Sequence, residues 1–84
     1  MRVAMSEVKP TDIHEAGLAL DLADLMFETR VGAGMTQAQL ATALGISQST
    51  VAAWESGDQV PRVDELERLA QLCGKRLHIR IDVD

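Results

Sequence analysis

The fold is decided by the stretch MTQAQLATALGISQSTVAAWESG, residues 35–57. Thr36 and Gln39 have the spacing of a capping box, which predicts a helix that begins directly after Thr36. Gly45 ends this helix after about nine residues, since glycine readily adopts the left-handed conformation of a tight turn. Ser47 is a favourable N-cap for a following helix. The stretch therefore predicts two short helices joined by a turn.

The second of these helices opens with polar residues, although its later positions are apolar. Val51 and Trp54 face inward and Ile46 precedes them in the turn, so these three residues hold the two helices together. Ala41 must be small, because the second helix crosses close above it. This arrangement predicts a helix-turn-helix, and we expect the exposed first turn of the second helix to be directed at a partner, for which DNA is the candidate.

Helical periodicity continues on both sides of this motif. The first pattern predicts a helix that ends near Val31, and the second predicts a helix from about Val63 that Gly74 ends. Residues 1–16 show no sustained period and are interpreted as an N-terminal arm or lead-in. The apolar-face positions are Leu18, Leu22, Leu25, Met26 and Thr29 before the motif, and Val63, Leu66, Leu69, Ala70 and Cys73 after it.

After Gly74 the period of the apolar pattern changes from helical to alternating, which predicts a strand over residues 76–84. A single strand leaves its backbone groups unpaired, and the sequence shows no second strand. We therefore expect the strand to pair antiparallel with its copy in a second subunit. The chain then consists of the arm (1–16), a helix-turn-helix domain (17–75) and a dimerisation strand (76–84). The apolar side chains expected in the dimer are Leu77, Ile79, Ile81 and Val83.

Charge and length limit the classes of function. The chain has 84 residues, enough for one small domain, and a net charge of −5, which by itself argues against nucleic-acid binding. The distribution of charge points the other way. Residues 29–54 hold Arg30 and no acid, whereas residues 1–28 carry six acids and two bases. A phosphate backbone could therefore approach the middle third of the chain without meeting a carboxylate.

Features typical of other protein classes are missing from the sequence. It has no glycine-rich phosphate loop, nucleophile–base arrangement or cluster of metal ligands, so we expect no enzymatic activity, no metal and no cofactor. No apolar run is long enough to span a membrane and no export signal is visible, so we expect a cytoplasmic protein. Cys73 can form no internal disulfide and is expected to pack as a small hydrophobe.

The stretch MTQAQLATALGISQSTVAAWESGDQVP, residues 35–61, resembles the DNA-binding core of Xre-type, lambda-repressor-like transcriptional regulators. The resemblance extends over residues 18–73, which is most of the chain. It implies a mainly α fold: a lambda-repressor-like DNA-binding domain of four to five helices, followed here by a C-terminal β-strand that pairs across a dimer. A helical domain followed by one strand, here KRLHIRIDV, further resembles HipB-like and HigA-like antitoxins of toxin–antitoxin operons.

The resemblance also implies roles for individual residues. Gln48 suits adenine, because its amide can donate one hydrogen bond and accept another, whereas Ala53 offers only a methyl contact to thymine. Arg30 would pair with Glu55 while facing the DNA backbone. For Arg62, a phosphate contact and a solvated loop residue are both open. The residues implied in DNA binding are Gln37 (a phosphate contact), Ser47 (mainly a cap), Gln48, Ser49, Thr50, Ala53, Arg30 and Arg62.

Two compatible functions from different classes follow from these features. The first is a sequence-specific transcriptional repressor that binds, as a homodimer, a palindromic operator in double-stranded DNA. The second is a protein-interaction module, the antitoxin of a type II toxin–antitoxin operon, which neutralises a basic toxin and represses its own operon. The acidic N-terminal third favours adding this second role. The alternative is a stand-alone regulator without a toxin.

Overall fold

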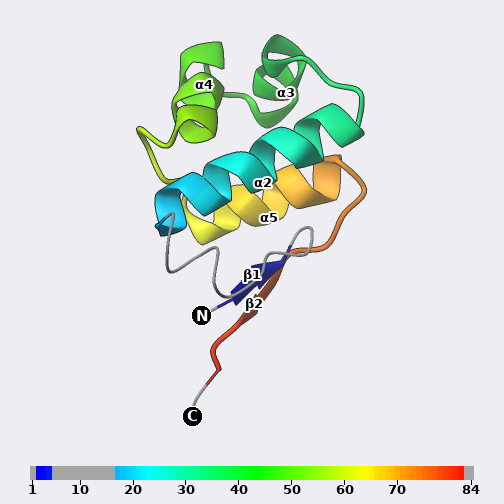
Figure 1. The fold of residues 1–84 in the computed structure, drawn as a ribbon. Coiled ribbons are helices and arrows are strands. Elements are labelled where there is room, and N and C mark those ends of the chain that lie inside the picture. The colour runs from blue at the N-terminus through cyan, green and yellow to red at the C-terminus, as the bar shows by residue number, and fades with distance from the viewer. Residues whose placement is uncertain (1, 5–16, 83–84) are drawn as a thin grey trace.

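The computed structural model describes residues 2–4 and 17–82. The described part is mainly helical, and the helices predicted on both sides of the motif and within it are confirmed (Figure 1). Helices α2 and α5 form a layer between the α3–α4 pair on one side and two short strands on the other. The elements are β1 (Arg2–Ala4), α2 (Leu18–Gly32), α3 (Gln37–Leu44), α4 (Gln48–Ser56), α5 (Val63–Leu72) and β2 (His78–Arg80).

The start of α3 and the turn that follows it form as their residue types dictate. The Thr36 hydroxyl accepts a hydrogen bond from the Gln39 amide at 3.1 Å, and the Gln39 side chain accepts one from the Thr36 amide at 2.8 Å. This is the capping box. Gly45 then adopts a left-handed φ of 72°, and the following amide of Ile46 donates to the Ala41 carbonyl at 3.0 Å. Glycine tolerates this φ without the steric cost that a β-carbon brings.

The core lies where the four helices meet. Its most deeply buried large side chains are Met26 of α2, Leu40 of α3, Val51 of α4 and Leu69 of α5. Trp54 is 3% exposed and belongs to the same cluster, and Ala41 is equally buried, as its place beneath α4 requires. Each helix contributes to one apolar core, which fixes the orientation of α4 relative to α3.

The strand pairing corrects one expectation from the sequence. The expectation that the chain offers no second strand is wrong, because β1 pairs antiparallel with β2 in the same chain. The register places Val3 opposite Ile79 and Ala4 opposite His78. Each strand has only three residues. A strand is recognised in a sequence by an alternating run of at least about four residues. β1 is shorter than that, so the sequence carries no periodic signal for it.

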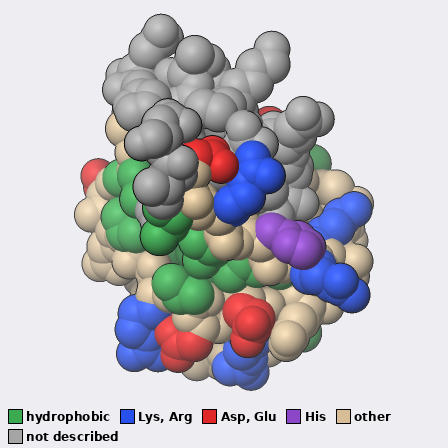
Figure 2. Space-filling model, turned by 90° about the horizontal axis from the view of Figure 1, so that it is seen from below, with side chains coloured by type: hydrophobic (Ala, Val, Ile, Leu, Met, Phe, Trp, Pro, Cys, Tyr) green, Lys and Arg blue, Asp and Glu red, His purple; other side chains and the backbone are tan. Residues whose placement is uncertain are grey.

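The apolar side of the C-terminal strand is only partly covered. Leu77 packs against the core, whereas Ile79 is 42% exposed and Ile81 is 70% exposed. Val83, the fourth residue expected in the dimer, lies outside the described residues, as does most of the expected arm. Figure 2 shows the face of the molecule on the strand side, where apolar side chains gather and basic and acidic side chains lie around them.

Candidate nucleic-acid interface

The first turn of α4 is held together by its own hydroxyl groups. Ser47 caps the helix by accepting a hydrogen bond from the Thr50 amide at 3.2 Å. The Ser47 hydroxyl also lies 3.0 Å from the Ser49 hydroxyl and 2.8 Å from the Thr50 hydroxyl. The hydroxyl groups of Ser47, Ser49 and Thr50 are therefore hydrogen-bonded to one another, which restricts the rotation of these side chains before any ligand binds.

Gln48 differs from its neighbours on this turn. Its side chain is exposed and makes no hydrogen bond with any other residue that the structure describes. One turn further along α4, Ala52 and Ala53 are half-buried and carry no polar group. The turn thus presents one free amide, which can donate and accept a hydrogen bond at the same time.

Glu55, near the end of α4, joins three helices. Its carboxylate accepts hydrogen bonds from Arg30 of α2, at 2.7 Å from Nε and 3.0 Å from Nη2, and from Gln37 of α3 at 3.2 Å. The remaining arm of the Arg30 guanidinium donates to the Met35 carbonyl at 2.7 Å. The side chains of Arg30 and Glu55 are 11% and 6% exposed. This network fixes the start of α3 and the end of α4 against α2.

The network leaves Arg30 little freedom to act on a ligand. Its hydrogen bond to Glu55 raises the pKa of the Arg30 guanidinium above its usual value, while burial opposes that shift. The guanidinium carbon also lies 5.3 Å from the centre of the Phe27 ring, within the range of a cation–π contact. Arg30 is thus placed to orient the helices, with most of its charge balanced by Glu55.

Arg62 lies at the N-cap of α5, in a part of the molecule separate from that network. Its guanidinium donates two parallel hydrogen bonds to Asp64, at 3.0 and 3.1 Å. Glu65 accepts a hydrogen bond from the Arg62 amide at 2.8 Å. The two side chains of the Arg62–Asp64 pair are 76% and 70% exposed. The bonds to Arg62 hold the pKa of the Asp64 carboxyl below its usual range.

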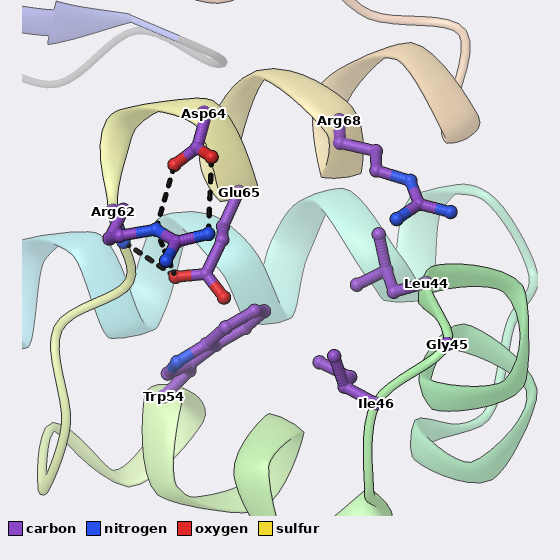
Figure 3. Close-up of a pocket in the computed structure, with 8 residues that line it drawn as sticks. All are labelled: Leu44, Gly45, Ile46, Trp54, Arg62, Asp64, Glu65 and Arg68. Atoms are coloured by element: carbon purple, nitrogen blue, oxygen red, sulfur yellow. Dashed lines mark hydrogen bonds and ion pairs between the residues drawn. The ribbon is translucent and has the colours of Figure 1, made fainter.

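Arg62 borders a pocket of about 280 Å³ beside the turn between α3 and α4 (Figure 3). In the close-up, Arg62 and Glu65 lie on the side of the pocket near the Trp54 indole, and Arg68 points toward Leu44 from a later turn of α5. The sequence alone did not identify Asp64 and Glu65 as partners of Arg62, or Arg68 as a neighbour of this turn. The three-residue spacing of Arg62 and Glu65 at the start of a helix was a local signal for part of this set. The lining residues are Leu44, Gly45, Ile46, Trp54, Arg62, Asp64, Glu65 and Arg68.

The surface around the motif carries little charge. Residues 31–54, which contain all of α3 and most of α4, include no Asp, Glu, Lys or Arg. Both helices begin with free backbone N–H groups, which attract anions. The structure thus brings together an uncharged surface, two helix N-termini and the free amide of Gln48. This is a surface that a polyanion can approach.

Other kinds of site find little support in the described part of the chain. It contains no group of three metal-ligating side chains. Cys73 is half-buried against the core, and burial raises the pKa of its thiol. None of the helices in residues 17–82 is long and apolar enough to cross a membrane.

Comparison with protein families gives a match. A family model described as helix-turn-helix matches residues 27–79, more than half of the chain. The matched range begins within α2, includes α3, α4 and α5, and ends within β2. The search of curated proteins gives no match.

Proposed function

The chain belongs to the helix-turn-helix family of DNA-binding transcription regulators, and from this premise we propose that it is a sequence-specific repressor acting on a palindromic operator. The observation that carries the proposal is the first turn of α4, where Gln48 is exposed and free while its neighbours hold one another. A glutamine amide can bond both N6 and N7 of adenine in the major groove. The alanines that follow add only apolar contacts to thymine methyl groups.

Phosphate contacts supplement this reading of bases. The N–H groups at the starts of α3 and α4 can bind phosphates directly. Gln37 uses one amide hydrogen for Glu55 at 3.2 Å, so the second hydrogen is left for a phosphate oxygen. Because the surface has few cations and one strong reader of bases, each half-site contributes modest affinity. Two subunits on a palindrome then double the contacts and the specificity.

Dimerisation through β2 remains our proposal, with its geometry adjusted to the strand pair. One edge of β2 is occupied by β1, and in the described part of the chain its other edge has no neighbouring strand. Two copies joined at that edge form a four-stranded sheet with both β2 strands at its centre. The half-exposed Ile79 and the exposed Ile81 support such an interface, as does the apolar surface on the strand side in Figure 2.

The charges of this segment favour some registers over others. A two-fold axis through Arg80 would place two arginines opposite each other, which is unfavourable. An axis through Ile79 sets Arg76 opposite Asp82 of the second copy, and an axis through Ile81 sets Arg80 opposite Asp82. Either of the latter two pairings is compatible with the proposal.

The test has two parts. Selection from random duplexes should yield a palindrome with an adenine at one fixed position of each half-site, and a footprint should protect both halves. Deleting residues 76–84 should leave a helical protein that sediments as a monomer and binds the palindrome weakly. A truncated protein that still sediments as a dimer would remove β2 from the interface. A selection that yields no consensus would remove sequence-specific binding.

A second role as an antitoxin is favoured by the outer side of α2. Leu20, Phe27 and Val31 are each about half exposed, at 51%, 49% and 49%. Helical spacing places them in one row, beside the exposed carboxylates of Asp24 and Glu28. An apolar row bordered by acids fits a partner with apolar and basic side chains, such as a basic toxin.

The role in toxin neutralisation is tested by co-expression with the product of the neighbouring gene. The wild-type chain should form a stable complex with that protein and suppress its toxicity, whereas Phe27→Asp should do neither while still binding DNA. If Phe27→Asp behaves as the wild type, the row on α2 is not the toxin interface. If the neighbouring product is neither toxic nor bound, the chain is a stand-alone regulator.

A further inference from the structure

The cations near the DNA-facing motif are few, and they differ in what they bind. Arg30 is held by Glu55 and is only 9% exposed. Arg62 and Arg68 are exposed cations that both border the pocket next to the α3–α4 turn (Figure 3). Arg68 forms no ion pair in the described part of the chain, whereas Arg62 is bound by the Asp64 carboxylate and lies 3.8 Å from the carboxylate of Glu65.

Asp64 occupies the face of Arg62 that a phosphate would use. The guanidinium presents Nε and one terminal nitrogen to the two carboxylate oxygens, at 3.0 and 3.1 Å. Carboxylate and phosphate are bound by arginine in the same two-bond geometry. One guanidinium edge cannot hold both anions with the same two N–H groups. Because both side chains are largely exposed, a phosphate can reach the pair, and the pair costs little to separate.

We propose that Asp64 is an internal competitor for Arg62: it holds the guanidinium in the free protein, and a DNA phosphate displaces it in the complex. The inference rests on the proposed DNA-binding function and adds to it a residue that weakens binding. In the exchange the Arg62–Asp64 contact is lost, an Arg62–phosphate contact forms, and the Asp64 carboxylate returns to solvent with its counterion. Asp64 thereby keeps the affinity for non-operator DNA low, since a phosphate that binds Arg62 must first displace it.

The decisive experiment is a double-mutant cycle on duplex DNA of mixed sequence at fixed salt. Asp64→Asn should bind about two- to five-fold more tightly per subunit, the range that corresponds to one exposed ion pair. Arg62→Met should bind more weakly than the wild type. In the Arg62→Met background, Asp64→Asn should add no more than the matched control Glu67→Gln. That control removes another exposed carboxylate of α5, one that forms no ion pair in the described part of the chain.

The outcomes separate competition from the simple effect of net charge. A gain from Asp64→Asn that persists without Arg62, or that only equals the gain from Glu67→Gln, would overturn the proposal. A second readout is the titration of the Asp64 carboxyl by NMR. Its pKa should lie below the usual range in the free protein and rise when the protein is saturated with DNA. A pKa that stays low in the complex would equally overturn it.

These tests also separate the failure of the inference from the failure of the proposed function. If the wild-type protein binds duplex DNA and the cycle shows no coupling, only the competition is wrong. If no variant binds duplex DNA, the proposed function fails and the competition fails with it. Thermal melts of each variant establish that the substitutions leave the fold intact.

Discussion

The network around Glu55 allows the stability effect of one substitution to be worked out from the structure. Arg30→Met removes two of the three hydrogen bonds to the Glu55 carboxylate, and the bond from Gln37 at 3.2 Å remains. The Glu55 side chain is 6% exposed, so water cannot replace the missing donors. The Met35 carbonyl also loses the donor that lies 2.7 Å away.

The expected cost follows from the burial of the pair. Removing one partner of a buried ion pair costs about 3–5 kcal/mol. Arg30 keeps some access to solvent, with 11% of its side chain exposed, which places the cost near the lower end, at about 3 kcal/mol. For a domain of this size, 1 kcal/mol corresponds to roughly 4–8 °C in melting temperature. We therefore expect Arg30→Met to melt roughly 12–24 °C below the wild type.

The assay is thermal unfolding followed by circular dichroism, with two comparison variants. Arg62→Met removes an arginine that is 76% exposed and should melt close to the wild type. Arg30→Met/Glu55→Met should recover much of the lost stability, because the main cost of the single substitution is a stranded carboxylate. Equal melting of Arg30→Met and Arg62→Met would refute the reasoning. A double variant no more stable than Arg30→Met would show that packing rather than charge determines the effect.

Three further predictions concern the DNA surface and the turn. Gln48→Ala should weaken operator binding by about 1–3 kcal/mol per half-site and leave binding to scrambled DNA unchanged; equal losses on both DNAs would make Gln48 a backbone contact. The slope of log K against log salt should be about −4 for a dimer, because Arg30 is neutralised by Glu55 and two exposed cations per subunit, Arg62 and Arg68, border the α3–α4 turn, each contributing roughly −0.9. A slope steeper than about −7 would reveal further basic contacts. Gly45→Ala should destabilise the fold by about 1 kcal/mol through its positive φ alone, since no atom lies within 4 Å of the added β-carbon. Gly32→Ala, at the end of α2 with equal space, should be neutral or stabilising. Equal effects of the two substitutions in denaturant unfolding would contradict this.

Most of the helical fold was predictable from sequence because its signals are local. The capping box of Thr36 and Gln39 spans three residues, and Gly45 requires only its own backbone conformation. Ser47 caps α4 through a neighbouring amide. Such features depend on interactions within about one helical turn, so residue types at fixed spacing are sufficient to reveal them. The network around Glu55 was reached in part through resemblance, which implied the ion pair with Arg30 but not the bond from Gln37.

The sequence by itself therefore determined the four helices, their caps and the exposed polar turn that opens α4. Only the tertiary structure decided which distant groups meet. The pairing of β1 with β2 joins the two ends of the described chain, and the bond from Gln37 to Glu55 crosses 18 residues. The physical reason is that contacts between distant residues form only after the core has placed the helices. A three-residue strand or a single amide forms no periodic pattern from which its partner could be predicted.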